Sequence, residues 1–164
     1  MPEEPIYTVE NMSLGPCAVM FDSVPMGGTK GGIKIPISIK AFDFKCDQEG
    51  EQVVKSIQVG AEVSVDMTLI EFTSTIINKM AGFTGGVFSS VPGRDRLALA
   101  KELTLTEIGG TGKTLTFHKA ILDPTNFNFP GSAEREVAVK FTCHKVGGDG
   151  SDKDDVFTYN VPAA

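Results

Sequence analysis

Short runs of alternating apolar and polar residues dominate the chain, and clusters of Gly, Pro and Asp separate them. Because successive side chains of a strand point to opposite faces, this pattern predicts a mainly β domain. We expect the first run to form a hairpin with the run after the glycine-rich turn, and residues 147–155 to be a hairpin loop between the last two strands. The runs predict strands over residues 17–21, 33–39, 53–59, 62–69, 97–107, 114–121, 136–144 and 156–161.

The isoleucine-rich run has two irregularities. Isoleucine occupies every second position over residues 33–39, yet Pro36 interrupts the run and has no backbone N–H, which predicts an edge strand or a bulge there. The apolar residues over 42–46 have the opposite parity. Since the side-chain period of a strand is two, this shift predicts a bulge, break or strand switch near Ala41.

One short helix interrupts the strand pattern. Four apolar residues have the spacing of a helical face: Phe72, Ile76, Ile77 and Met80. Gly82 supplies the stop signal. We expect long inter-strand loops over about residues 41–60 and 82–96, the second with one short strand. No repeat or change in composition divides the chain, so residues 1–164 are predicted to form a single domain.

Charge and cysteine content limit the possible partners. A chain of 164 residues with 15 Lys plus Arg against 21 Asp plus Glu has a formal net charge of -6, which argues against a surface that grips DNA phosphates. Three scattered cysteines predict reduced thiols rather than a disulfide framework. The acidic N-terminus is unlike a signal peptide, and no apolar window reaches the roughly 18 residues of a membrane helix, so a soluble protein without membrane association is expected.

The sequence Gly112-Lys113-Thr114 resembles the end of a phosphate-binding loop. Glu107 stands where that motif needs its first glycine, and the residues after Lys113 alternate as in a strand, although a phosphate-binding loop must lead into a helix. A glycine hairpin between two strands fits both flanks better. We therefore expect no nucleotide and no other cofactor.

No residues form a recognisable catalytic or metal-binding motif. His118 and His144 are the only histidines. Cys143 and His144 are neighbours in a strand, so their side chains should point to opposite faces and cannot readily share one metal ion. We expect a half-buried Cys143 thiol and an exposed His144 imidazole. The acidic segment after Gly147 lacks the ligand spacing of a calcium loop. The chain has no nucleophile elbow. We predict no metal site and no enzymatic activity.

Several segments, in order along the chain, resemble the tail tube proteins of long-tailed bacteriophages. The clearest runs from Lys45 through Asp47-Gln48 to Gly50 and is similar to a Lys-x-Asp-Gln-x-Gly loop of that family, although Gln52 stands where the family commonly has proline. The other similar segments are residues 15–33, 62–80, 113–118 and 129–133.

The resemblance implies an antiparallel β-sandwich or half-barrel with one short flanking α-helix. It also implies a virion structural protein whose hexameric rings stack into a hollow tail tube, assembled in the host bacterial cytoplasm, through which DNA passes without specific binding. Other copies of the chain would be the main partners, with the tape measure protein, tail tip or terminator proteins and, in a contractile tail, a sheath. Joining sheet edges between protomers would also remove unpaired edges, and head-to-tail contacts can build a cylinder.

Two groups of residues become candidates under this interpretation. The polar face of a strand pair is predicted to line the channel, or else to face bulk solvent in a monomer: Glu62, Ser64, Asp66 and Thr68, and more weakly Lys34, Ser38 and Lys40. A polar turn is the first candidate for the contact with the next ring: Asp47, Gln48, Glu49, Gly50 and Glu51. The segment 149–155 and the two termini are second candidates.

Two alternatives remain open. A monomeric β-sandwich binding or decoration module would normally display clustered exposed aromatic side chains, but the chain has no Trp and only two Tyr. A ring-forming tube protein like that of type VI secretion would assemble by the same kind of contacts between copies. The loop segments similar to the phage family favour the phage tail tube over it.

Overall fold

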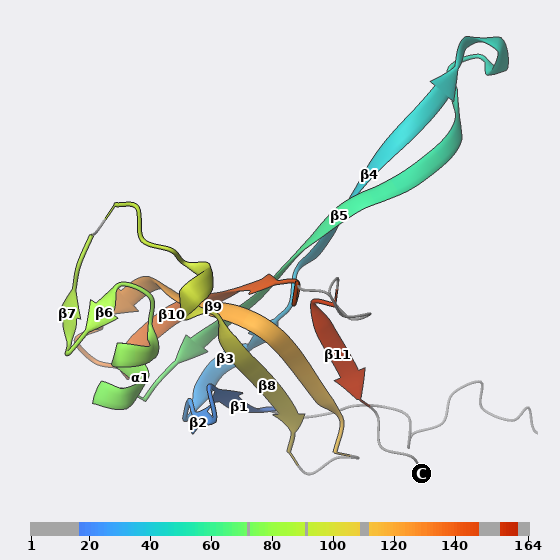
Figure 1. The fold of residues 1–164 in the computed structure, drawn as a ribbon. Coiled ribbons are helices and arrows are strands. Elements are labelled where there is room, and N and C mark those ends of the chain that lie inside the picture. Colours follow the sequence, from blue (N-terminus) through green and yellow to red (C-terminus); the bar gives the residue numbers. More distant parts are fainter. Residues whose placement is uncertain (1–16, 72, 91, 109–111, 148–154, 161–164) are drawn as a thin grey trace, which may run out of the picture.

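The computed structural model describes residues 17–71, 73–90, 92–108, 112–147 and 155–160 (Figure 1). All strand pairs in it are antiparallel, which confirms the mainly β fold class. In spatial order the main sheet contains β2 (Val24–Pro25), β1 (Cys17–Phe21), β8 (Lys101–Glu107), β9 (Thr114–Asn128), β10 (Glu136–His144), β5 (Gln52–Leu69) and β3 (Thr29–Lys34). β4 (Ile37–Cys46) also pairs with β5, β11 (Phe157–Asn160) pairs with β9, and β6 (Phe83–Thr84) pairs with β7 (Val87–Phe88).

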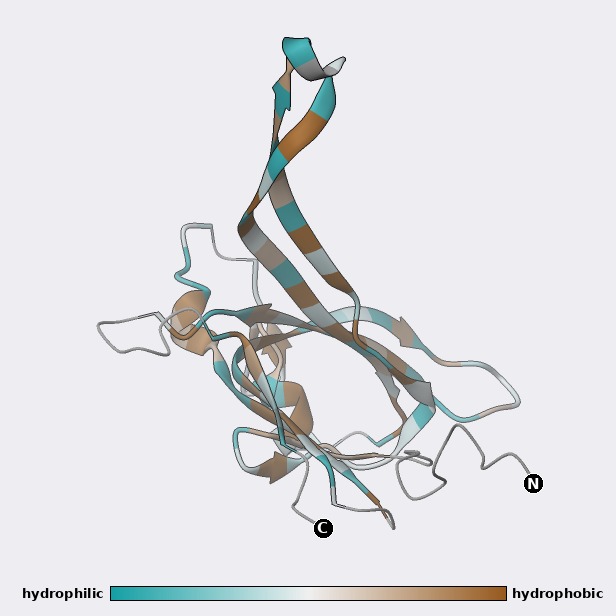
Figure 2. Ribbon diagram, turned by 90° about the vertical axis from the view of Figure 1, so that its right-hand side faces the viewer, coloured by the Kyte–Doolittle hydropathy of each residue, from teal (hydrophilic) through white to brown (hydrophobic). Residues whose placement is uncertain are grey.

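The apolar face of the main sheet forms the core. On β5 the residues Val63, Val65, Met67 and Leu69 are buried, and the residues between them are not, as the alternation predicts. The ring centroids of Phe21 on β1 and Phe141 on β10 lie 5.3 Å apart although β8 and β9 separate these strands. Three strand spacings in a flat sheet would span about 14 Å, so the sheet curves around its apolar face as a half-barrel (Figure 2).

The predicted helix is α1 (Ser74–Lys79), which follows β5. The Thr73 hydroxyl accepts a hydrogen bond from the Ile76 N–H at 3.3 Å and caps the first turn. Ile76 and Met80 are buried in the core as expected, whereas Ile77 is only partly buried; Phe72 lies outside the described residues.

Beyond the main sheet, β4 and the outer half of β5 continue as a projecting two-stranded ribbon, which we call the arm (residues 39–59; Figure 1). The expected loop over residues 41–60 is therefore wrong, as is the division of β5 into two strands. Gly60 stays in the ladder opposite Lys40, so the glycine does not break the strand. The register then shifts and leaves Val59 without a partner on β4, which confirms the predicted bulge near Ala41.

Two predicted hairpins are wrong. β1 pairs with β2 and β8, whereas β3 pairs with β5 on the other side of the sheet. A tight turn at Asp22 and Ser23, both with positive φ, returns the chain to β2 before it crosses to β3. The segment before β11 is not a hairpin loop either, because β11 pairs with β9 in line with β10 rather than with β10 itself. Residues 148–154 of that segment lie outside the described residues.

Two smaller differences concern irregular segments. Residues 82–96 were expected to contain one short strand, but β6 and β7 form a two-stranded hairpin there. A short 3-10 helix, Leu97–Leu99, precedes β8 within the run predicted as strand. Pro36 lies between β3 and β4 on the outer side of β5, where its carbonyl accepts a hydrogen bond from the Ser64 N–H at 3.1 Å, as its lack of an N–H predicts for an edge position.

Candidate functional site

The seven residues predicted to line a channel lie on one face of the sheet, opposite the core. On β5 they alternate with buried residues: Glu62, Ser64, Asp66 and Thr68. Lys34 lies directly opposite Asp66 and Ser38 opposite Glu62 in the neighbouring strands, while the Lys40 ammonium pairs with the Glu62 carboxylate. This hydrogen bond from Lys40 lowers the pKa of Glu62 below its usual range. We call this surface the polar face.

Charges of alternating sign cross the polar face. Asp66 lies between Lys34 on β3 and Lys140 on β10, and Lys140 is in turn opposite Asp123 on β9. Arg96 pairs with Asp123. Opposite charges on neighbouring strands stabilise the pairing and offset one another, so the face is hydrophilic rather than acidic.

Sequence reasoning missed Lys140 and Asp123 as members of this face. The alternation of β10 was visible, but assigning its polar side to the same surface as β5 required the strand pairing. Hydroxyl side chains extend the polar face in two places, where Thr142 lies opposite Ser64 and Thr116 lies opposite Thr104, whereas the buried Ile121 lies opposite Thr142 on β9.

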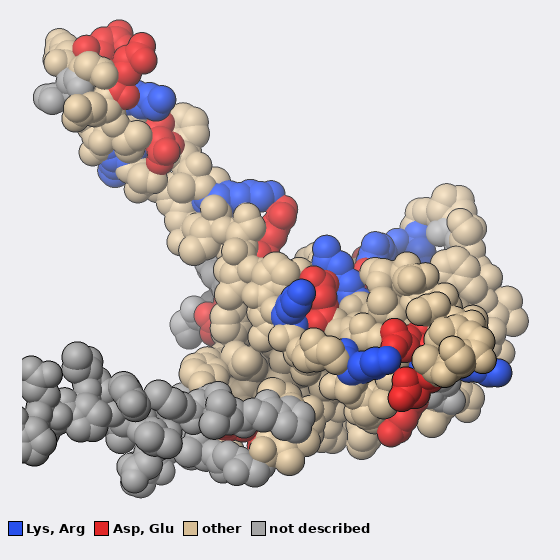
Figure 3. Space-filling view, turned by 180° about the vertical axis from the view of Figure 1, so that it is seen from behind, with Lys and Arg blue, Asp and Glu red and all other residues tan. Residues whose placement is uncertain are grey.

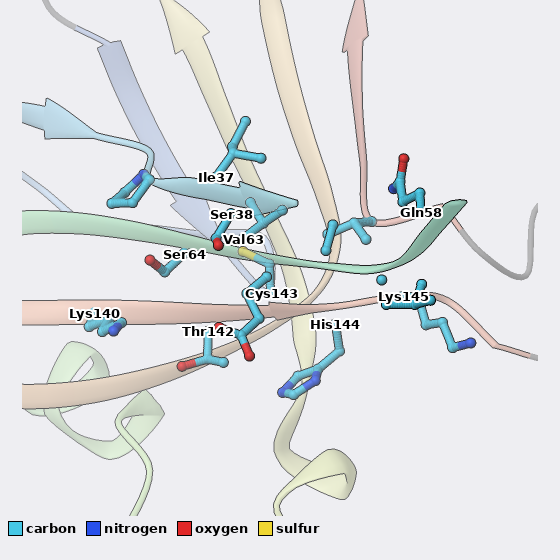
Figure 4. A pocket seen from close by; sticks show the side chains of 16 residues that line it. Ile37, Ser38, Gln58, Val63, Ser64, Lys140, Thr142, Cys143, His144 and Lys145 are labelled. Carbon is cyan, nitrogen blue, oxygen red and sulfur yellow. The ribbon is translucent and has the colours of Figure 1, made fainter. Parts of the chain in front are cut away.

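An open groove of about 1030 Å³ lies where the arm leaves the sheet (Figure 4). Ser64, Lys140, Thr142 and His144 line it together with residues of the arm base. Among the described residues no polar or charged side chain is buried, so the groove has no desolvated polar group that would fix the orientation of a small ligand.

Cys143 points to the opposite side of β10 from Thr142 and His144 (Figure 4), as predicted for neighbours in a strand. The expected half-buried thiol is, however, fully in the core at 8% exposure. Burial raises the pKa of Cys143 to about 12. The protonated thiol is therefore a poor nucleophile and a poor metal ligand at neutral pH.

Thiol labelling tests this burial. At pH 8 a pKa of about 12 leaves roughly one thiolate in ten thousand, so iodoacetamide should leave Cys143 unmodified in the native protein and modify it after unfolding. Cys46, which is only partly buried on the arm, serves as the internal control and should react in the native state. Peptide mass spectrometry after timed labelling measures both; equal native rates would contradict the assignment.

The chain around the apparent phosphate-binding motif joins two antiparallel strands. The Glu107 N–H donates to the Lys113 carbonyl at 3.0 Å, and β9 starts at Thr114, where a phosphate-binding loop would start a helix. This geometry supports the predicted hairpin; residues 109–111 lie outside the described part.

The described residues contain neither a cluster of metal-ligand side chains nor a membrane-spanning helix. His, Cys, Asp and Glu side chains do not gather there in groups of three or more that would suit a metal ion. No helix in the same part of the chain is long and apolar enough to cross a membrane.

The arm carries many hydrophobic residues (Figure 2), and several of their large side chains are exposed. Phe42 and Phe44 are 56% and 46% exposed, and their ring centroids lie 4.9 Å apart on one side of the ribbon. The Ser56 hydroxyl donates to the Asp43 carboxylate on the other side. Seven large apolar side chains of the arm are exposed: Ile39, Phe42, Phe44, Val53, Val54, Ile57 and Val59.

The predicted ring-contact residues form the tip of the arm. A 3-10 turn, Asp47–Glu49, is closed by Gly50 and Glu51, which both have positive φ, at 68° and 63°. The Glu51 N–H donates to the Cys46 carbonyl at 3.3 Å. Acidic side chains gather at this tip (Figure 3), as far from the core as the described chain reaches; the Glu49 side chain lies outside the described part, as do both termini and most of residues 149–155.

Comparisons with known proteins support the fold alone. No family model and no curated protein matches the sequence. The structure is similar to a chain of a solved structure described as "Virion of native gene transfer agent (GTA) particle", with a TM-score of 0.50, 10% sequence identity, and coverage of 89% of this chain and 96% of that chain. The similarity covers nearly the whole of both chains, so it concerns the overall fold with its curved sheet and is not limited to a single structural motif.

Proposed function

We propose that this chain is a virion structural protein of the phage tail tube type, which assembles as hexameric rings stacked into a hollow cylinder. The fold similarity to a chain of a gene transfer agent virion supports the particle context. The ordered sequence resemblance supplies the tail tube class and the number of subunits.

The exposed apolar arm is the observation that carries the proposal. Two-stranded ribbons are at best marginally stable in water on their own. Here the ribbon leaves the core and keeps seven large apolar side chains exposed among the described residues. A soluble monomer rarely exposes so many large apolar side chains on one projecting ribbon unless another protein covers them. Another copy of the chain is the partner that a tube provides.

Negative-stain microscopy and sedimentation velocity of purified protein at increasing concentration, with and without tail tip proteins of the same particle, test the proposal. Rings or tubes with an open channel are expected. A monomer that persists under both conditions and binds a glycan would instead support the decoration module.

In the assembled tube we propose that the polar face lines the channel. Its lysines and carboxylates alternate across neighbouring strands, as at Lys34, Asp66 and Lys140. A lining of balanced charge has little net attraction for phosphates, so DNA would slide past without being held.

Reversing two charges on the polar face should convert the channel wall into a DNA-binding surface. Glu62→Lys with Asp66→Lys leaves Lys34 and Lys40 without their opposing carboxylates and leaves Lys140 with Asp123 alone. We expect this variant to assemble but to retain DNA in a filter-binding assay, with affinity that falls steeply with salt. The neutral pair Glu62→Gln with Asp66→Asn controls for lost ion pairs. Equal DNA retention by wild type and the lysine variant would contradict the channel assignment.

A further inference from the structure

Four phenylalanines form a connected cluster around β6, β7 and the turn between β9 and β10. The ring centroid of Phe83 lies 5.2 Å from that of Phe88 and 6.2 Å from that of Phe127, and Phe127 stacks with Phe129 at 6.5 Å. Phe88 and Phe129 are each 61% exposed. We call these four residues the aromatic patch. Phe83 packs against the core, but Phe88 and Phe129 stay mostly exposed, so the outer part of the aromatic patch can accept an apolar partner.

Two exposed arginines border the aromatic patch. The Arg135 guanidinium carbon lies 5.6 Å from the ring centroid of Phe129, and Arg94 lines a pocket together with Phe83. Neither arginine has an ion pair with a described residue. Aromatic and arginine side chains are the residue types that most often dominate binding energy at protein interfaces.

The arm complements the aromatic patch in both polarity and charge. Its sides expose apolar residues such as Phe42 and Ile57, and its tip carries the carboxylates of Asp47 and Glu51. The arm projects from one end of the sheet, whereas β6 and β7 lie at the other end (Figure 1). One molecule cannot bring these two surfaces together, but two molecules can.

We infer that the aromatic patch is the receptor for the arm of a second copy of this chain, with Asp47 and Glu51 of the tip facing Arg94 and Arg135. This inference rests on the proposed assembly and names its contact surface. Each copy donates one arm and receives another, so the contact is head-to-tail and can repeat through an assembly. A symmetric arm-to-arm contact would close as a dimer and leave the aromatic patch exposed.

Cross-linking locates the contact directly. Cys46 adjoins the arm tip, and Ser132→Cys places a second thiol three residues after Phe129, on an exposed turn. In a Cys17→Ser background, a short bis-maleimide should join Cys46 of one copy to the thiol introduced at position 132 of another and give a covalent ladder on denaturing gels. Tyr159→Cys on β11, at a 52% exposed position away from the aromatic patch, is the matched control and should give no ladder.

Charge exchange tests the same contact without a cross-linker. Glu51→Arg and Arg135→Glu should each raise the concentration needed for assembly by about tenfold or more, and the two changes combined in one chain should restore it. Circular dichroism and urea unfolding verify that each variant is folded.

Assembly that depends on the arm but shows neither the Cys46 cross-link nor the charge rescue would overturn this inference and leave the proposed function standing. Wild-type protein that never assembles, alone or with tail tip proteins, would overturn both. A covalent dimer joined through two Cys46 thiols, formed without Ser132→Cys, would show arm-to-arm contact and also overturn the inference.

Discussion

Replacing Phe42 and Phe44 together with serine is expected to abolish assembly and to leave the monomer folded. The two rings contact each other at 4.9 Å but lie outside the core, and about half of each is exposed. In the proposed assembly they become buried on association, and losing two such aromatic anchors should cost several kcal/mol and raise the assembly concentration by about a hundredfold or more.

Sedimentation velocity and electron microscopy measure this loss, and urea unfolding of the dissociated protein checks the fold. Ile108→Ser is the matched control, because Ile108 is 53% exposed at the end of β8, away from both the arm and the aromatic patch. We expect it to assemble as wild type does. Normal tubes from the Phe42 and Phe44 double variant would refute a role for the arm.

The second large effect concerns the core rather than the interface. Phe141→Ala should lower the free energy of unfolding by about 3–5 kcal/mol, since Phe141 is 0% exposed and its removal leaves a cavity beside Phe21. Domains of this size have a total stability of about 5–15 kcal/mol, so this one change removes a large share of it.

Phe44→Ala is the matched control, because it removes the same phenylalanine ring from an exposed position. Phe44 is 46% exposed on the arm, so its loss should change the stability of the monomer by less than about 1 kcal/mol. Equilibrium urea unfolding at a concentration where the protein is monomeric measures both variants. Equal destabilisation by the two changes would mean that the arm belongs to the folded core.

Strand identity was predictable from the sequence where one face of a strand is buried. Val63 to Leu69 alternate because the core accepts every second side chain, and the predicted limits of β10 are those of the structure. Strand pairing was not predictable in the same way. The turn after β1 looks like a simple hairpin in sequence, yet the tertiary match of Val19 and Phe21 with β8 determines the neighbour.

For the candidate surfaces too, the residues of one strand face were predictable, and the neighbours that strand pairing brings to that face were not. Periodicity placed Glu62, Ser64, Asp66 and Thr68 on one face, but only the sheet order adds Lys140 and Asp123 and reveals that the charges offset one another. The arm was mistaken for a loop because its apolar residues change parity at the bulge and resemble irregular chain. The aromatic patch joins two segments that are distant in sequence, residues 83–88 and 127–129, so no local pattern indicated it.

Cryo-electron microscopy of the assembled protein is the most direct test of the central claim that this chain builds a hollow tube through its arm. We predict stacked rings around an open channel, with the polar face of each copy toward the lumen and each arm covered by a neighbouring copy. Assemblies without a channel, or tubes in which the arms extend into solvent, would contradict the account.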